Sequence, residues 1–345
     1  MKGKKNETKL LIIYTGGTIG MVHDPVTGSL VPIDFRYISQ HVPELKKFGH
    51  DLYSVSFDPA IDSSNIDPAV WIRMAVIIEE NYDRYDGFVI LHGTDTMAYS
   101  ASALSFMLEN LAKPVIFTGS QLPIGLLRTD GKENLITAIE IAAAREQKRS
   151  YVPEVCIYFD NKLSRGNRTT KLSAEHFDAF SSPNYPFLAE VGLHLKYNKG
   201  YIAAQKSSRK LVVHKDFDTN VAILKLFPGI NRNFVQSVLS TKGLKGLIIE
   251  TFGSGNAPTY DWFIDELQKF LKKGGIILNV TQCHGGSVEM GLYETSRHLL
   301  AAGVISGRDI TSEASVTKLM YLLGRYQTRE EVIKGLNTSL AGEIS

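Results

Sequence analysis

The chain has 345 residues, 43% of them hydrophobic and 21% charged, and its formal net charge is +2. These values are typical of a folded globular protein, and they exclude one that depends on a global positive field to reach nucleic acid or an acidic surface. The length exceeds that of one typical domain and favours two.

Short apolar runs alternate along the chain with stretches of helical period, and most of these runs contain no polar alternation. Strands whose two faces are both covered by helices have this pattern, so we predict an α/β fold with a mostly parallel sheet. The predicted strands are, in chain order, residues 10–14, 52–57, 87–91, 114–117, 155–159, 221–226, 246–250 and 275–280.

Two segments between these strands have features of their own. The polar segment 24–36 is long for a connection between a strand and a helix, and a long loop beside a pocket often acts as a lid. The segment 96–110 has apolar residues at helical spacing, and we expect Thr94 or Asp95 to cap this helix by accepting its first free amides.

The stretch 187–215 interrupts the alternation, because it is rich in Lys, Gly, Tyr, Ser and His and has no long apolar period. The alternation resumes near Val221. We therefore expect one domain over residues 1–195, a linker over 196–218 and a second domain over 219–345.

Two predicted strands end in turns rich in glycine and hydroxyl groups, Thr15-Gly16-Gly17-Thr18 and His92-Gly93-Thr94-Asp95-Thr96. Ligands of open α/β sheets bind beyond the carboxyl ends of the strands, so two such ends suggest one shared pocket. A threonine hydroxyl there can attack an acyl carbon if a neighbouring group accepts its proton, and glycine amides can hold the oxyanion. The alternative is structural: a tight turn in the first case and a helix cap in the second.

Two further segments allow the same pair of interpretations. The polar stretch 161–171 is either a solvated basic loop or the source of a lysine, Lys171, that a pocket desolvates into a proton acceptor. Asp62, Ser63 and Ser64 either clasp the backbone of an amino acid or cap the helix that runs through Trp71. We expect His92 to pack or bond locally and not to act as the base.

The sequence contains no H-E-x-x-H or C-x-x-C spacing, so we predict no metal site and no cofactor. Its two cysteines, Cys156 and Cys283, lie in apolar, strand-like contexts where cysteine behaves as a small hydrophobe. The low cysteine count fits a reducing compartment, no apolar stretch approaches the ~20 residues of a membrane span, and no signal peptide is recognisable. We therefore expect a cytoplasmic protein.

Together these motifs resemble the bacterial-type L-asparaginases, most closely their cytoplasmic type I group. The resemblance covers residues 9–342 and is carried by Y-T-G-G-T-I-G at 14–20, L-H-G-T-D-T at 91–96 and N-R-T-T-K at 167–171, with 113–116, 118–121, 252–256 and 279–283 adding to it. It implies a larger N-terminal α/β domain and a smaller, Rossmann-like C-terminal one. It also implies a homodimer or homotetramer whose active sites lie between the N-terminal domain of one subunit and the C-terminal domain of its neighbour.

The resemblance further implies hydrolysis of L-asparagine to L-aspartate and ammonia through a covalent acyl-enzyme, with neither nucleic acid nor membrane as a partner. The roles that it implies are Thr15 as nucleophile, Thr94 and Lys171 as proton relay, Asp95 as the group that binds the substrate's amino group, Asp62, Ser63 and Ser64 as its backbone clasp, and Asn256 as a residue that completes a partner subunit's pocket.

The chain departs from the family pattern at two positions. Many members place a tyrosine in the first lid, but none lies between Tyr14 and Tyr37 here, and the matching candidate is Tyr293. Certain type I enzymes bind allosteric asparagine with an arginine where this chain has Glu250, and a carboxylate cannot replace the bidentate grip of arginine. We predict weak or absent cooperativity, or an altered site that uses Thr170, Thr281 and Cys283.

Two other functions compete with amide hydrolysis. The amidase subunit of a tRNA-dependent amidotransferase shares these motifs, but it usually carries an extra N-terminal domain, and only 14 residues precede Thr15 here. An amino-acid sensor would use the hydroxyls and Asp95 to hold a ligand without turnover, but such a protein has no need of Lys171 as a proton acceptor.

Overall fold

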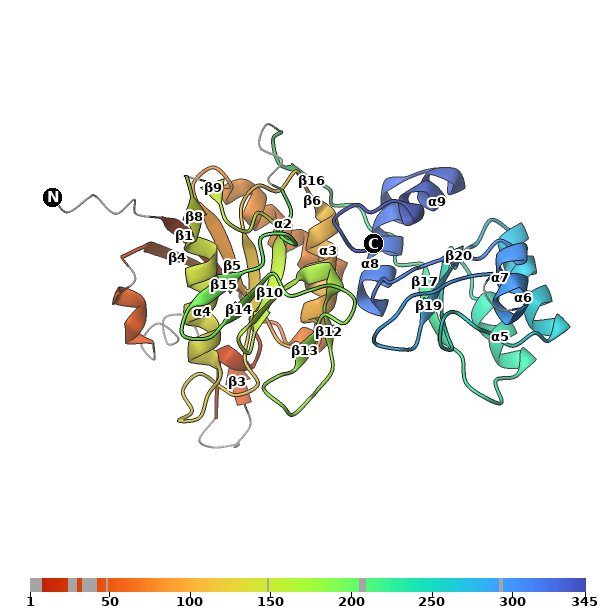
Figure 1. Ribbon diagram of the computed structural model, residues 1–345, viewed down its shortest axis with the longest axis horizontal. Helices are drawn as coiled ribbons and strands as arrows, with labels where there is room; N and C mark the ends of the chain where they lie inside the picture. The colour runs from red at the N-terminus through yellow and green to blue at the C-terminus, as the bar shows by residue number, and fades with distance from the viewer. Residues whose placement is uncertain are drawn as a thin grey trace. The chain divides into compact units, whose positions relative to one another are not determined.

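The computed structural model describes residues 8–23, 30–32, 42–47, 49–147, 149–204, 209–291 and 294–345, and the chain divides into two compact units, Met1–Lys215 and Asp216–Ser345. Strands and helices alternate in both units, which confirms the predicted α/β fold (Figure 1). The α-helices are α2 (Pro68–Asn81), α3 (Met97–Met107) and α4 (Gly131–Ala143) in the first unit, and α5 (Arg232–Leu239), α6 (Asp261–Lys272), α7 (Glu294–Ala302), α8 (Ser312–Arg325) and α9 (Arg329–Asn337) in the second.

An eight-stranded sheet forms the centre of the first unit, in the order β15-β14-β11-β10-β7-β5-β1-β4. The five strands from β4 to β10 are parallel, and β11, β14 and β15 extend the sheet in antiparallel fashion. The bounds of these strands are β1 (Lys9–Tyr14), β4 (Asp51–Ser56), β5 (Gly87–Leu91), β7 (Val115–Thr118), β10 (Val155–Phe159), β11 (Lys162–Arg165), β14 (Ala189–Val191) and β15 (Leu195–Tyr197). Each of the five strands predicted for this unit is present, with ends within one residue of the prediction.

Shorter elements connect this framework. The short strands are β2 (Met21–His23), β3 (Leu30–Pro32), β6 (Leu108–Glu109), β8 (Arg145–Glu146), β9 (Arg149–Ser150), β12 (Thr170–Lys171), β13 (Phe180–Ser181) and β16 (Val212–Val213). The 3-10 helices are η1 (Thr18–Gly20), η2 (Pro43–Lys47), η3 (Ser63–Asn65) and η4 (Gly166–Arg168). The stretch 187–215 thus contributes β14, β15 and β16, which its composition did not predict.

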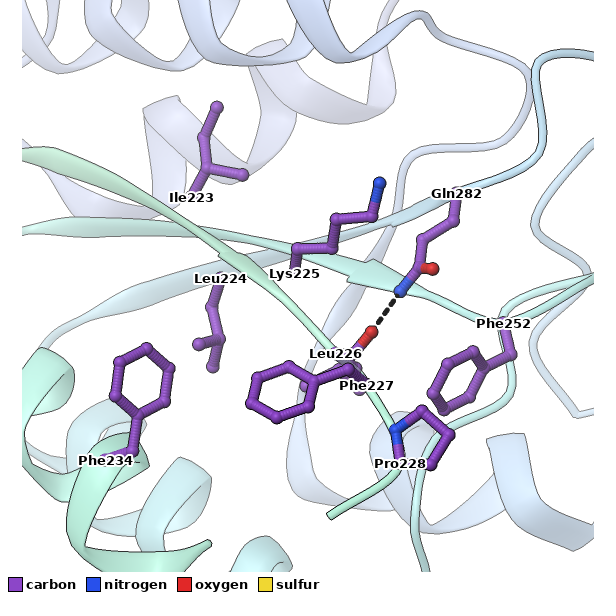
Figure 2. Close-up of a pocket in the computed structure, with 9 residues that line it drawn as sticks. All are labelled: Ile223, Leu224, Lys225, Leu226, Phe227, Pro228, Phe234, Phe252 and Gln282. Carbon is purple, nitrogen blue, oxygen red and sulfur yellow. Dashed lines mark hydrogen bonds between the residues drawn. The ribbon is translucent and has the colours of Figure 1, made fainter. Parts of the chain in front are cut away.

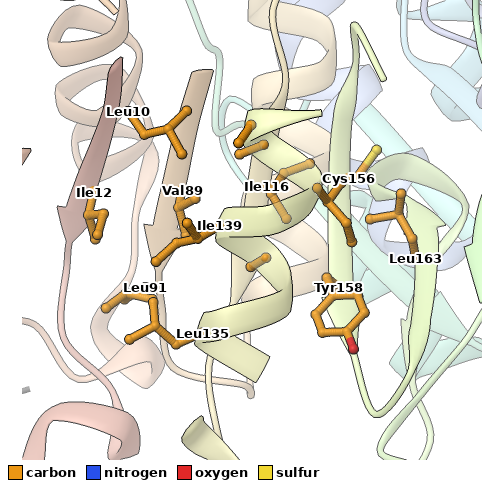
Figure 3. Packing of buried hydrophobic residues seen from close by; sticks show 14 of the residues in the cluster. Leu10, Ile12, Val89, Leu91, Ile116, Leu135, Ile139, Cys156, Tyr158 and Leu163 are labelled. Atoms are coloured by element: carbon orange, nitrogen blue, oxygen red, sulfur yellow. The ribbon is translucent and has the colours of Figure 1, made fainter. Parts of the chain in front are cut away.

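The inner parallel strands β1, β5, β7 and β10 are buried along almost their whole length, which explains why they are mostly apolar. The edge strand β4 is partly exposed. Figure 3 shows α4 across one face, with Leu135 next to Leu91 and Ile139 next to Val89, all fully buried. Cys156 of β10 lies in the same cluster, where burial raises the pKa of its thiol well above the usual value. The prediction of a buried cysteine is correct for Cys156 but wrong for Cys283, which is exposed in the second unit just after the strand β19 (Ile276–Thr281).

The predicted cap of α3 and the alternative cap considered for α2 are both wrong, because other residues occupy the two N-cap positions. The N-cap residue of α3 is Thr96, and its hydroxyl donates to the Ser63 carbonyl (2.7 Å) instead of capping the helix. The N-cap of α2 is Asp67, whose carboxylate accepts from the amide of Val70 (3.1 Å). Neither Thr94 and Asp95 nor Asp62 is therefore needed to begin these long helices.

The second unit contains a parallel four-stranded sheet in the order β17-β18-β19-β20, with β17 (Val221–Lys225), β18 (Gly246–Thr251), β19 (Ile276–Thr281) and β20 (Ile305–Ser306). The three strands predicted for this half are β17, β18 and β19. Leu247 and Ile249 of β18 pack with Phe263 and Leu267 of α6 in a buried cluster. The α8 helix contacts β17, β18 and β19.

A buried ion pair fastens the end of the chain to α8. Lys318 of α8 and Glu343 are both 0% exposed, and their Nζ and Oε1 atoms lie 2.6 Å apart. Lys318 also donates to the carbonyl of Thr338 (2.8 Å), and Glu343 accepts the amides of Leu340 (3.1 Å) and Ala341 (2.9 Å). Burial lowers the pKa of Lys318, so the carboxylate is what keeps an ammonium group tolerable there.

We predict that Glu343→Gln lowers the free energy of unfolding by about 3 kcal/mol or more, because it leaves a buried ammonium group without its counter-charge. Urea denaturation followed by circular dichroism measures this difference. Lys269→Gln is the matched control: Lys269 is 55% exposed in its pair with Glu266, so its loss should cost less than about 1 kcal/mol. Equal effects of the two substitutions would contradict the assignment.

Candidate active site

Three neighbouring strands end at one edge of the larger sheet. In the register of the parallel pairs, Tyr14 of β1 lies beside Leu91 of β5, and Leu91 lies beside Thr118 of β7. The Thr15 amide donates to the Leu91 carbonyl and the His92 amide to the Thr118 carbonyl, each at 3.0 Å. The turns that follow β1 and β5 therefore start side by side, as their shared pocket requires.

Glycine allows these turns to come together. Gly16 has φ +135°, and a Cβ placed on it would lie 2.1 Å from the Ile61 carbonyl oxygen. Gly17 has φ +90°, and its Cβ would lie 2.4 Å from the amide nitrogen of Gly93. Both conformations and both close approaches exclude a side chain. The turn after β1 therefore contacts the segment before Asp62 on one side and the turn after β5 on the other.

Thr15 is buried, and both its backbone and its hydroxyl are hydrogen-bonded. The residue is 1% exposed, and its backbone carbonyl accepts the amide of Ile61 (2.8 Å). Its hydroxyl donates to the carbonyl oxygen of Leu91 at 2.9 Å. A backbone carbonyl can accept this hydrogen bond but cannot take the proton, so Leu91 is no general base for this hydroxyl.

Lys171, Thr94 and Asp95 form a hydrogen-bonded cluster at the end of β5. The Nζ atom of Lys171 lies 2.7 Å from the Thr94 hydroxyl oxygen and 2.7 Å from Oδ1 of Asp95. The Lys171 side chain is 15% exposed and that of Asp95 66%. The structure thus brings together the three residues predicted here. The Lys171 side chain is largely buried, and Asp95 is its ionic partner.

The turn at residues 62–64 lies against the turn after β5. The Asp62 carboxylate accepts the amide (2.9 Å) and the hydroxyl (2.6 Å) of Ser64, and these bonds lower the pKa of Asp62. A Cβ on Gly93 would lie 2.4 Å from the Ser63 hydroxyl oxygen, which shows how closely the two turns pack. The candidate substrate clasp at residues 62–64 therefore lies next to the turn that carries the candidate relay residue Thr94.

An anchored segment delivers Lys171 to this cluster. Arg165 donates to the Glu154 carboxylate (2.6 Å) in a buried ion pair, and its guanidinium lies 4.4 Å from the centre of the Tyr185 ring. The hydroxyl of Thr169 donates to the carbonyl of Arg165 (2.8 Å). The backbone is fixed two residues before Lys171, and this restricts where the lysine side chain can reach.

Most of the other predicted site residues belong to the second unit. In the second unit Asn256 accepts from the Thr295 hydroxyl (2.7 Å), Glu250 accepts from the Ser312 hydroxyl (2.7 Å), and Thr281 accepts the Cys283 amide (3.0 Å). Thr170 lies in β12 of the first unit. Tyr293 and most of the predicted lid, residues 24–29 and 33–36, lie outside the described residues.

A separate pocket of about 430 Å³ lies in the second unit. Figure 2 shows aromatic side chains around it and the amide of Gln282 turned to the backbone. Gln282 donates to the carbonyls of Leu226 (2.6 Å) and Glu250 (2.8 Å), which ties the ends of β17 and β18 together. This pocket offers apolar surface, whereas the reactive groups gather at the ends of β1 and β5.

The described residues contain neither a helix that could span a membrane nor a cluster of metal ligands. No helix among them has the length and apolar character to cross a bilayer. Within the same residues, no group of three or more His, Cys, Asp and Glu side chains is placed to hold a metal ion.

Gln121 contacts the cluster at Thr94, although the sequence assigned it no role beyond its place in the motif at 118–121. Its Oε1 lies 3.3 Å from the Thr94 hydroxyl oxygen. Its position could have been predicted in part. Gln121 follows β7, which is the parallel neighbour of β5, and the carboxyl ends of parallel strands meet at one edge of a sheet.

His92 stabilises the same turn from inside the core, as predicted. Its Nδ1 lies 2.7 Å from the Gly93 carbonyl oxygen, which can only accept, so Nδ1 carries the proton. Its Nε2 then accepts from the hydroxyl of Ser100 (2.9 Å), which itself accepts from the Trp71 indole (3.0 Å). Complete burial lowers the pKa of His92 to about 4, so the ring is neutral at pH 7.

We predict a pH-dependent stability that originates at His92. Between pH 6.5 and about 4 the unfolded chain binds a proton at this ring that the folded chain does not, so stability falls with pH by up to about 1.4 kcal/mol per pH unit. Urea denaturation from pH 7 to 4.5 should show the difference between wild type and His92→Gln shrinking as the pH falls. His194→Gln, at an exposed position, should run parallel to wild type. A parallel His92→Gln curve would contradict a neutral, buried ring.

Family models match both units: "Asparaginase, N-terminal" over residues 9–203 and "Glutaminase/Asparaginase C-terminal domain" over residues 220–335. L-asparaginase 1 of Escherichia coli K12 is 44% identical over 341 residues, which are 97% of this chain and 98% of that protein. The crystal structure of L-asparaginase I from Vibrio cholerae matches with a TM-score of 0.89 and 40% identity, covering 98% of this chain and 99% of that one. The thermostable L-asparaginase from Thermococcus kodakarensis matches with the same TM-score, 32% identity and the same coverage. With both units matched nearly throughout, this chain belongs to the asparaginase family.

Proposed function

We propose that this chain hydrolyses the side-chain amide of L-asparagine to L-aspartate and ammonia, with Thr15 as the nucleophile. One observation carries the proposal: Lys171 lies 2.7 Å from both the Thr94 hydroxyl and the Asp95 carboxylate, at the strand end next to Thr15. The relatives described above, which are named L-asparaginases, support the same reaction.

In the proposed first step the Thr15 hydroxyl turns from the Leu91 carbonyl toward the relay and gives up its proton. Its oxygen forms a bond to the amide carbon of asparagine, and the carbon–nitrogen bond breaks as the nitrogen takes up a proton and leaves as ammonia. Water then attacks the aspartyl ester, the relay accepts one of its protons, and Thr15 recovers its own. Thr94 and Lys171 carry the proton in both steps.

The substrate's α-amino and α-carboxyl groups need partners of their own. The Asp95 carboxylate is paired with Lys171 yet 66% exposed, so an ammonium group can approach it from the open side. Asp62, Ser63 and Ser64 present a carboxylate, hydroxyls and backbone next to the same turn. This set favours a free α-amino acid over an amide within a peptide chain.

A side-chain amide is a poor electrophile, so stabilisation of the oxyanion must supply a large part of the rate. The backbone amides of the Gly16–Gly17 turn are the candidate donors, because they adjoin the nucleophile. One such donor typically contributes about 3 kcal/mol to the stability of the transition state.

The remaining predictions from the resemblance are kept as proposals. These are a cytoplasmic homodimer or homotetramer, the contribution of Asn256 to a pocket of the partner subunit, the role of Tyr293 beside the nucleophile, and reduced asparagine cooperativity with Glu250 in place of arginine.

We predict that Thr15→Ala and Lys171→Met each lower ammonia release from asparagine by about 10³-fold or more, because one removes the attacking oxygen and the other the end of the relay. A coupled ammonia assay on the folded full-length variants measures this. Thr8→Ala is the control, since Thr8 precedes β1 at the opposite end of the strand from Thr15.

Normal turnover by both variants would rule out the proposed mechanism. Wild-type protein that binds asparagine in a calorimeter, with no ammonia released, would favour the amino-acid sensor instead.

A further inference from the structure

Gln121 lies on a loop that the fold holds firmly. The loop follows β7, and the carboxylate of Asp130 accepts the backbone amides of Gln121 (2.9 Å) and Leu122 (3.1 Å). Asn134 of α4 donates to the carbonyl of Gly119 (3.0 Å). The backbone of Gln121 is therefore fixed on both sides, which restricts where its side chain can reach.

The hydrogen bonds of the Gln121 side chain assign its two ends. Nε2 lies 3.1 Å from the carbonyl oxygen of His176, which can only accept, so the amide nitrogen must be at that end. Oε1 then faces the hydroxyl of Thr94 at 3.3 Å, and since Oε1 can only accept, the hydroxyl must donate.

This assignment completes the hydrogen bonds around Thr94. A hydroxyl has one proton to donate and two lone pairs to accept with. Lys171 donates to the Thr94 oxygen at 2.7 Å and uses one lone pair. The proton of Thr94 points away from Lys171, toward Gln121. Gln121 is thus the group toward which the Thr94 hydroxyl directs its proton in this structure.

Gln121 also holds the loop that leaves Lys171. His176 lies in residues 172–179, between β12 and β13, and its amide donates to the hydroxyl of Ser173 (2.9 Å). Asp178 of the same loop pairs with Lys162 of β11 (2.9 Å). One glutamine side chain therefore connects the turn after β5 with the loop that follows the lysine of the relay.

We propose that Gln121 is a positioning residue of the proton relay, which sets the orientation of the Thr94 hydroxyl and fixes the 172–179 loop against it. The inference rests on the proposed function and names a residue to which that mechanism gave no role. Gln121 gains no proton and forms no covalent bond. Its bond to Thr94 is long, so it breaks readily when Thr94 turns its proton toward Lys171.

Gln121→Met tests the proposal, because methionine keeps the length and volume of the side chain and removes both hydrogen bonds. We expect kcat for asparagine to fall about fivefold to tenfold, with KM within twofold and Tm within about 2 °C of wild type. Leu127→Ala is the control on the same loop, since Leu127 is fully exposed and should leave kcat unchanged. A wild-type kcat in Gln121→Met would overturn the positioning role. A fall in kcat together with a large change in KM and a large fall in Tm would also overturn it.

A crystal structure of Gln121→Met separates this inference from the proposed function. We expect a changed or divided rotamer at Thr94 and a displaced 172–179 loop. An unchanged Thr94, still bonded to Lys171, would refute the inference whatever reaction the protein catalyses. A changed Thr94 in a protein whose wild type releases no ammonia would refute only the proposed function.

Discussion

The candidate site depends on the close approach of backbones at the carboxyl ends of β1 and β5. Gly16 and Gly17 have no side chains, so the turn after β1 can lie against Ile61 and Gly93 at distances where any Cβ would collide. This contact, and not a pair of side chains, brings the turn that begins with Thr15 against the turn that contains Thr94. A side chain at either glycine would force apart segments that are remote in the sequence. The positive φ and the lack of a Cβ at these two positions are therefore needed to assemble the candidate site.

Two lysine–carboxylate pairs in the same chain differ in their exposure to solvent. Lys318 and Glu343 are fully buried and hold a terminal segment in place, and breaking such a pair is costly. Lys171 and Asp95 have a nearly identical separation, but the Asp95 side chain is 66% exposed. Water can solvate that carboxylate when its partner changes, so Asp95 can take a second cation at low cost.

Most of the main strands could be predicted because they are continuous apolar runs that are almost entirely buried, as in β1, β5, β10, β18 and β19. The edge strands β4 and β17 are partly exposed. The strands β11, β14 and β15 could not be predicted, since each is only three or four residues long and lacks such a run. Helix caps failed for a related reason: several Thr and Asp residues precede α2 and α3, and only tertiary contacts decide among them. Thr96, for example, bonds to the Ser63 carbonyl, which lies 33 residues earlier.

Side-chain partners across the site were likewise beyond the sequence. The motifs indicated that Thr94 and Lys171 belong together, but the ion pair of Lys171 with Asp95 and the contact of Gln121 with Thr94 arise from three strand ends and a hairpin loop. The buried ring of His92 is bonded to Ser100 of α3, which in turn accepts from Trp71 of α2.

The most direct test of the account is a crystal structure of the protein with bound L-aspartate, the proposed product. The account predicts aspartate at the ends of β1 and β5, with its side-chain carboxylate at hydrogen-bonding distance from Thr15 and Thr94 and its amino group against Asp95. Aspartate bound only elsewhere, with these strand ends holding no ligand at saturating concentration, would contradict it.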